Sequence, residues 1–292
     1  METHFHNTEN SGNSKESSLS QNFISPGSYV LNCSTLLTEL PVLERAQAAK
    51  DAGFDHVEFW WPFDGNPSPT SAEVDEFIAS LESAGVALKG LNFWAGNMAA
   101  GDRGMVSIIG AEEDFAKNVD IVVDIGRRTG CRAFNALYGL RTDGQDPTAQ
   151  DATAAANLAL AAGKVAEIGG TVLVEPVSGA EAYPLKRCAD AAEVVAQVRA
   201  DGPENIAVLA DFYHMHVNGD DVAAVIEAEA ANFGHIQIAD ADGRGAPGTG
   251  SLPLRQWIDR AYDLGYTGAV ALEYKQDRAT AFDWLDRAAQ TA

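Results

Sequence analysis

The chain has 292 residues, of which 46% are hydrophobic and 21% charged, a composition typical of globular proteins with a sizeable core. Its formal net charge of −22 would repel a phosphate backbone, so no nucleic acid is expected as a partner. No run of about 18 apolar residues occurs, so no membrane-spanning helix and no membrane partner are expected.

The first 27 residues are rich in Ser, Asn, Glu and His and lack the apolar segment of a secretory signal. We predict a disordered tail over 1–27 and one domain over 28–292, close to the ~250 residues typical of one (β/α)₈ barrel. Three cysteines, Cys33, Cys131 and Cys188, are far apart and form no CxxC motif. This pattern predicts reduced thiols with packing roles in a cytoplasmic protein.

Eight apolar runs alternate with eight helical stretches along the domain. The runs are predicted as strands at 29–32, 56–59, 86–92, 132–136, 171–175, 206–211, 233–238 and 269–273. The helices are predicted at 38–53, 71–84, 112–129, 148–168, 190–199, 220–231, 253–264 and from Thr280 onward. We expect Thr38 to be the N-cap of the first helix, with Pro41 in its first turn. Gly53 and Gly85 are expected to end the first and second helices.

This alternation of strands and helices predicts a parallel sheet covered by helices. The main rival is an open, doubly wound sheet, which often carries a glycine-rich nucleotide loop after its first strand. Here the first strand is followed by Cys33-Ser-Thr, and neither GxGxxG at that place nor GxxxxGK[ST] anywhere is found. The pattern therefore favours an α/β fold with a single (β/α)₈ TIM barrel.

Four successive strands each place an oxygen-bearing side chain at or near the C-terminal end. These residues are Glu175, Asp211, Gln237 and Glu273. Because the C-terminal ends of barrel strands line the active-site mouth, we expect the four side chains to form one contiguous half-ring. Three carboxylates and an amide are hard oxygen ligands, which suit Mg²⁺ or Mn²⁺ better than Zn²⁺. The sequence therefore predicts a divalent metal site.

Carboxylates beside a metal can move protons. A metal-polarised carbonyl acidifies the adjacent C–H, one glutamate removes the proton, and the enediolate is stabilised. This is the chemistry of isomerases and epimerases, and it needs no organic cofactor. Four aromatic residues after strands two and three, Trp60, Trp61, Phe93 and Trp94, would wall off the mouth and exclude water. Core packing accounts equally well for at least two of them.

The motifs around these residues resemble the hydroxypyruvate isomerase family of the xylose-isomerase-like barrel superfamily. They are Val174-Glu175-Pro176, Asp211-Phe-Tyr-His214-Met215, His235-Ile-Gln237-Ile-Ala239 and Leu272-Glu273-Tyr-Lys275, with support from Val57-Glu58-Phe59 and Gly101-Asp-Arg103-Gly104. The resemblance implies conversion of hydroxypyruvate and tartronate semialdehyde, or of a related 2-oxo acid such as 2-oxo-tetronate. It also implies an acid/base pair of Glu175 and Glu273 and a metal shell of Glu175, Asp211, Gln237 and Glu273. Sugar epimerases of the superfamily tend to place His at the position of Gln237.

Three further residues are candidates for binding the substrate. His214 lies just past a predicted ligand, while Arg103 and Lys275 are cations suited to an anionic carboxylate. The loop at 243–251 departs from the family pattern, because a His and two Glu that are common there are absent. The substrate therefore stays open between a 2-oxo acid and a sugar.

The residues leave other functions open as well. A ketose 3-epimerase could use the same scaffold, and a non-catalytic barrel could keep the metal and a sugar ligand. An endonuclease of the same superfamily would need more His ligands and a basic groove, and neither is visible. A homo-oligomer also remains open.

Overall fold

The computed structural model describes residues 29–200 and 202–285. The predicted tail at 1–27 lies outside the described residues. The last predicted helix shows helical residues only at 283–285, and the rest of that prediction also lies outside them. Within the described part of the chain, no helix is both long and apolar enough to cross a membrane. Cys33, Cys131 and Cys188 are all buried and free, as the sequence predicted.

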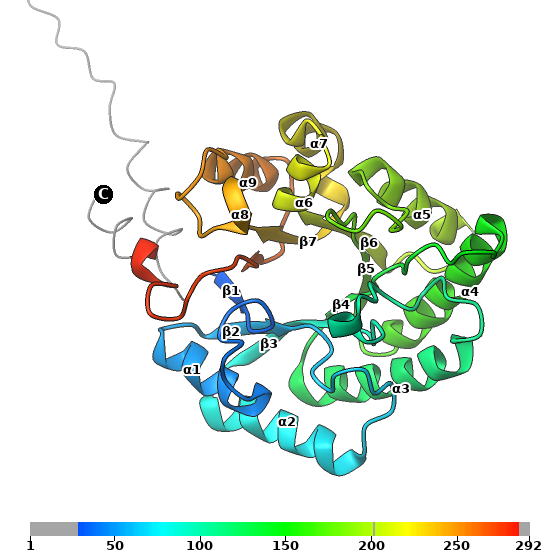
Figure 1. Cartoon of the computed structure of the whole chain (residues 1–292), viewed down its shortest axis with the longest axis horizontal. Helices are drawn as coiled ribbons and strands as arrows, with labels where there is room; N and C mark the ends of the chain where they lie inside the picture. Colours follow the sequence, from blue (N-terminus) through cyan, green and yellow to red (C-terminus); the bar gives the residue numbers. More distant parts are fainter. Residues whose placement is uncertain (1–28, 201, 286–292) are drawn as a thin grey trace, which may run out of the picture.

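Eight parallel strands close into a barrel in sequence order, with β1 pairing to both β2 and β8. The strands are β1 (Tyr29–Asn32), β2 (His56–Phe59), β3 (Ala87–Asn92), β4 (Ala133–Asn135), β5 (Thr171–Val174), β6 (Ile206–Asp211), β7 (Phe233–Ile238) and β8 (Val270–Leu272). Figure 1 looks down this barrel, with the strands at the centre and the helices around them. The predicted TIM barrel is confirmed, and each strand lies within about two residues of its predicted range.

Helices follow the strands and cover the outside of the barrel (Figure 1). The α-helices are α1 (Arg45–Asp51), α2 (Ser71–Ala84), α3 (Glu112–Thr129), α4 (Pro147–Ala166), α5 (Cys188–Ala200), α6 (Phe212–Val217), α7 (Val222–Glu229), α8 (Ala241–Arg244) and α9 (Leu254–Asp263). Within residues 29–200 and 202–285, three 3₁₀ turns accompany them, η2 (Val42–Glu44), η3 (Met98–Ala100) and η4 (Ala230–Asn232). The short helices α6 and α8 were not predicted, and both border the C-terminal ends of the strands.

The predicted start of the first helix is wrong. Thr38 is not its N-cap, because the chain stays irregular to Pro41, which precedes η2, and α1 begins only at Arg45. The Arg45 guanidinium donates to the carbonyls of Cys33, Thr38 and Leu40, and so holds this stretch as a loop. The predicted stops are confirmed, with Gly53 at φ 93° and Gly85 at φ 67°, conformations that favour glycine.

The core has two layers. A large cluster packs the outer faces of the strands against the helices, while Leu173, Ala207 and Leu209 fill the inside of the barrel. Gly234 lies at an irregularity in the pairing of β6 and β7, between the residues that pair with Val208 and Leu209. A Cβ at Gly234 would lie 2.6 Å from Leu173 Cδ2 and 2.8 Å from Ala207 Cβ. The interior therefore requires glycine at this position.

We expect Gly234→Ala to lower the free energy of unfolding by about 1–3 kcal/mol, because the added methyl overpacks the barrel interior. Gly163→Ala is the matched control, since Gly163 lies in α4 and nothing is within 4 Å of an added Cβ. The control should raise stability by about 0.5–1 kcal/mol through its helix propensity. Urea unfolding measures both, and equal stabilities for the two variants would contradict this packing.

Candidate active site

Each strand carries a buried polar side chain at or near its C-terminal end. Taken in strand order, these are Asn32, Glu58, Asn92, Asn135, Glu175, Asp211, Gln237 and Glu273, none more than 5% exposed. Because all eight strands run in the same direction, these side chains gather at one end of the barrel. Four are carboxyl groups, so this end holds a concentration of buried negative charge.

The structure places the four predicted metal ligands together at this end. Glu175 directly follows β5, Asp211 ends β6, and Gln237 pairs in register with Asp211 on the neighbouring strand. Glu273 directly follows β8, and its backbone N–H donates to the carbonyl of Ile238, 3.0 Å away. The four residues therefore occupy one contiguous arc of the barrel, as the sequence predicted.

His214 joins this arc through helix α6. Asp211 caps α6, and its Oδ1 accepts the backbone N–H groups of Tyr213 at 2.8 Å and His214 at 3.1 Å. The turn brings the His214 ring to the carboxylates, with Nε2 at 3.6 Å from Asp211 Oδ2 and 3.9 Å from Glu175 Oε1. Its Nδ1 faces the Ser178 hydroxyl at 2.7 Å. Ligand atoms of Glu175, Asp211 and His214 all lie within 4.8 Å of one another.

Arg244 is a buried site residue that the sequence analysis missed. Its Nη2 donates to Asp211 Oδ2 at 2.8 Å and to Glu273 Oε1 at 2.6 Å, and its Nε donates to the Glu273 carbonyl at 2.9 Å. Its guanidinium also lies over the Tyr213 ring, 5.4 Å from the centroid. The residue has a φ of 62° and lies in the loop at 243–251, which departs from the family pattern. The sequence signal that could have revealed Arg244 is an arginine within a glycine-rich loop that follows β7.

A second network, also missed, centres on Glu58. Its Oε1 accepts Asn32 Nδ2 at 2.8 Å and Gln237 Nε2 at 2.7 Å, and its Oε2 lies 2.7 Å from His235 Nε2. The same Asn32 amide group donates to Glu273 Oε2 at 3.1 Å. Glu58 therefore contacts one predicted metal ligand, Gln237, directly and a second, Glu273, through Asn32.

Burial and mutual repulsion perturb the acids of this site. Burial, with the neighbouring Asp211 charge, raises the pKa of Glu175 to about 8, although Asn135 donates to its Oε2 at 2.7 Å. Burial also raises the pKa of Glu273 well above its ordinary range, while the Arg244 charge opposes that shift. Burial lowers the pKa of His214 to about 4, so its ring is neutral at pH 7. Glu175 is thus suited to hold and release a proton near neutral pH, and Glu273 holds its proton more tightly than an exposed carboxyl group.

The raised pKa of Glu175 predicts a pH-dependent stability. A carboxyl whose pKa is higher in the folded than in the unfolded state stabilises the fold fully below its unfolded pKa, and that stability is lost as pH rises through about 8. Metal-stripped protein should therefore lose free energy of unfolding between pH 5 and 9. Glu175→Gln should reduce that loss in urea unfolding, and an unchanged pH dependence would contradict the shifted pKa.

The donor set fits a hard divalent cation. Gln237 Oε1 and Asn135 Oδ1 are buried acceptors without a hydrogen-bond partner among the described residues. Clustered carboxylates of Glu175, Asp211 and Glu273 supply the negative charge that a cation would neutralise. Arg244 already places one positive group on two of them. Oxygen ligands of this kind suit Mg²⁺ or Mn²⁺, and His214 offers one nitrogen beside them.

The two predicted carboxylate-binding cations, Arg103 and Lys275, lie on the loops after β3 and β8. The Arg103 guanidinium donates to the backbone carbonyls of Met98 at 3.1 Å and Asp102 at 2.6 Å. Lys275 is exposed, and its backbone N–H donates to the carbonyl of Arg244 at 2.7 Å. Their role in binding substrate stays a prediction.

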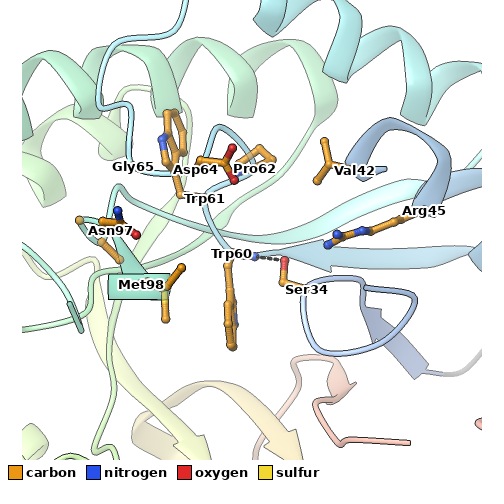
Figure 2. Close-up of a pocket in the computed structure, with 13 residues that line it drawn as sticks. Ser34, Val42, Arg45, Trp60, Trp61, Pro62, Asp64, Gly65, Asn97 and Met98 are labelled. Carbon is orange, nitrogen blue, oxygen red and sulfur yellow. Dashed lines mark hydrogen bonds between the residues drawn. The ribbon is translucent and has the colours of Figure 1, made fainter. Parts of the chain in front are cut away.

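The loops after β1, β2 and β3 enclose a pocket of about 670 Å³ on the same face of the barrel. Trp60 and Trp61 line it, and Figure 2 shows Arg45 and Asn97 at opposite sides of it. Phe93 belongs to the core and is 1% exposed. Trp94 donates through Nε1 to the Gly65 carbonyl at 2.9 Å, which ties the second and third loops together. Of the four aromatic residues, two therefore line this pocket.

Comparison with known proteins agrees with this fold. Residues 46–291 match the family described as the xylose isomerase-like TIM barrel. A putative hydroxypyruvate isomerase of Streptomyces coelicolor is 48% identical over 90% of this chain and 97% of its own length. A 2-oxo-tetronate isomerase of Cupriavidus necator is 31% identical over 88% of this chain and 96% of its own length.

Among solved structures, a protein of Brucella melitensis titled AP endonuclease, family 2, superposes with a TM-score of 0.78. It is 32% identical and covers 89% of this chain and 98% of its own. The matches span nearly the whole barrel, including all four strands that carry the predicted metal ligands. The chain therefore belongs to the xylose isomerase-like TIM barrel family and, within it, to the hydroxypyruvate isomerase family of isomerases.

Proposed function

We propose that the protein is a metal-dependent isomerase that interconverts hydroxypyruvate and tartronate semialdehyde, or a closely related 2-oxo acid. The observation that carries this proposal is the arc of Glu175, Asp211, Gln237 and Glu273, buried together at the C-terminal ends of β5–β8. The names of the relatives in Streptomyces coelicolor and Cupriavidus necator support the choice of substrate class.

These four residues would hold the cation, with His214 beside them. A bound Mg²⁺ or Mn²⁺ would polarise the substrate carbonyl and so acidify the neighbouring C–H bond. The free acceptor on Gln237 and the charge of the three carboxylates are the features of this chain that fit such a cation. Arg244 would then share Asp211 and Glu273 with it.

Glu175 and Glu273 would move the proton. In the forward direction one carboxylate removes a proton from the hydroxymethyl carbon, and the electron pair moves to give an enediolate. A carboxylic acid then delivers a proton to the former carbonyl carbon, which becomes the hydroxyl-bearing carbon of tartronate semialdehyde. The proton of the substrate's hydroxymethyl oxygen moves to the former carbonyl oxygen, so that the terminal carbon becomes the aldehyde. Burial raises the pKa values of both groups, which suits Glu175 to exchange a proton near neutral pH and keeps Glu273 a weaker acid than an exposed carboxyl group.

Cationic side chains would hold the substrate carboxylate. Arg103 and Lys275 remain the sequence-predicted candidates, and the structure adds Arg244, whose guanidinium lies at the reacting carboxylates. A guanidinium presents paired N–H donors that match a carboxylate. Its contacts with Asp211 and Glu273 place it within reach of any acid bound there.

The test is turnover by metal-stripped and metal-restored protein on hydroxypyruvate, 2-oxo-tetronate and a panel of ketohexoses. We expect turnover of at least one 2-oxo acid, loss of that turnover on chelation, and recovery with Mn²⁺ or Mg²⁺. Epimerisation of ketohexoses without turnover of any acid would instead establish the 3-epimerase. Binding of these compounds without any conversion would establish a non-catalytic barrel.

A further inference from the structure

Two amide side chains near the carboxylates are held in one orientation by a single buried acceptor. An amide has a donor end and an acceptor end, and a half-turn of the group exchanges them. An ionised carboxylate only accepts hydrogen bonds, so a neighbouring amide must turn its NH₂ group toward it. Glu58 is that acceptor for both Gln237 and Asn32.

We propose that Glu58 is a positioning residue, which turns the Gln237 amide so that its oxygen is presented to the cation. This inference rests on the proposed metal-dependent function. Gln237 Nε2 is 2.7 Å from Glu58 Oε1, which leaves Oε1 of Gln237 buried and without a partner in the described chain. The opposite orientation would point an NH₂ group at the cation and lose the contact with Glu58.

Asn32 links Glu58 to Glu273, one of the two residues proposed to transfer the proton. The Asn32 Oδ1 accepts the backbone N–H groups of Ser34 at 2.9 Å and Thr35 at 3.1 Å, which fixes this amide from its other end. Its Nδ2 therefore faces both Glu58 Oε1 and Glu273 Oε2. The Glu58 carboxylate thus orients Gln237 on β7 and, through Asn32, restrains Glu273 after β8.

The surroundings of Glu58 hold its own carboxylate in place. His235 contacts Oε2, so both oxygens are engaged and the group resists rotation. Gly90 on the neighbouring strand β3 leaves room for the Glu58 side chain. A Cβ at this position would lie 3.0 Å from Glu58 Oε2 and 3.1 Å from Glu58 Cβ. Side chains that orient metal ligands in this way typically change metal affinity by about 10–100-fold when removed.

The test is calorimetric titration of metal-stripped protein with Mn²⁺, with the fold of each variant checked by circular dichroism. Glu58→Met removes the acceptor and should weaken Mn²⁺ binding by about 10–100-fold. Glu58→Gln keeps one oxygen for the two amides and should restore much of that affinity. The control Glu193→Met changes an exposed glutamate on α5 and should bind Mn²⁺ like the wild type.

Gly90→Ala gives a second, independent test, because it crowds the Glu58 carboxylate without removing a donor or acceptor. It should also weaken Mn²⁺ binding, and it decides the question if Glu58→Met does not fold. In a Gln237→Ala background the effect of Glu58→Met on Mn²⁺ affinity should largely vanish, since Glu58 acts mainly through that amide.

The outcomes separate this inference from the proposed function. A wild-type protein that binds no Mn²⁺ would overturn the metal-dependent function and this inference with it. A wild type that binds Mn²⁺, with folded Glu58→Met and Gly90→Ala variants that bind it equally well, would overturn the role of Glu58 alone. Weaker binding by Glu58→Met that Glu58→Gln does not improve would show that Glu58 acts through its charge and not by orienting the amide.

Discussion

Replacing Glu273 by glutamine is expected to lower kcat by about 10²–10⁴-fold while Mn²⁺ stays bound. Glutamine keeps an oxygen that can face the cation, but it cannot take up and return a proton. Glu273 is 3% exposed, and the isosteric amide keeps one of the two oxygens that accept hydrogen bonds from Asn32 and Arg244. Steady-state kinetics on the 2-oxo acid, with metal content measured on the same sample, gives the result.

The matched control is Glu193→Gln on the exposed side of α5, which should leave kcat unchanged. If Glu273→Gln keeps near-full turnover on every carbonyl substrate of the wild type with metal in place, the two-carboxylate mechanism is wrong. A loss of turnover that follows only a loss of metal would assign Glu273 to metal binding alone. The ratio of turnover to metal content therefore separates the two roles of this residue.

Replacing Arg244 by methionine should change stability and metal affinity in opposite directions. Arg244 is 9% exposed and bridges Asp211 and Glu273, so its removal leaves two buried carboxylates without their positive partner. Breaking such a pair typically costs about 3–5 kcal/mol of unfolding free energy. The cost should be smaller at pH 5 than at pH 8, because burial raises the pKa of Glu273 and its protonation removes one of the two repelling charges. Mn²⁺ should bind more tightly, since the competing guanidinium is gone.

Urea unfolding of metal-stripped protein and Mn²⁺ titration measure these two effects. Arg260→Met is the control, because Arg260 pairs with Glu227 at an exposed site where both side chains are about half exposed. Exposed ion pairs of this kind are worth about 0–1 kcal/mol, so the control should change little. Weaker Mn²⁺ binding by a folded Arg244→Met variant would show that Arg244 supports the cation site and does not compete for it.

The fold was predictable because its signals are local. Strands of three to six residues alternate with helices, several of which end at glycine, and this order predicts a parallel sheet covered by helices. The missing nucleotide loop after the first strand then favours a closed barrel over an open sheet. The start of α1 was not predictable, because it depends on the Arg45 side chain binding carbonyls up to 12 residues away. Helix α6 was missed because it is a single short turn that begins immediately after β6 and is capped by Asp211.

The site was predictable where a polar residue ends an apolar strand, as at Glu175, Asp211 and Glu273. Arg244 was missed because a left-handed backbone at φ 62°, which the sequence does not reveal, carries its side chain back over the barrel. The role of Glu58 was not predictable, because its partners lie 26 to 179 residues away in sequence. The site contacts of Arg244 and Glu58 therefore became visible only from the three-dimensional arrangement of the strands, and not from patterns along the chain.

The most direct test of the central claim is conversion of the 2-oxo acid in D₂O by metal-restored protein, followed by proton NMR of the product. Two carboxylic acids that exchange protons with solvent should place deuterium on the carbon that becomes hydroxyl-bearing. The account predicts this label in the wild type and its loss, along with turnover, in Glu273→Gln. A product that keeps the substrate's own hydrogen with no deuterium would show a direct hydride shift and contradict proton transfer by Glu175 and Glu273.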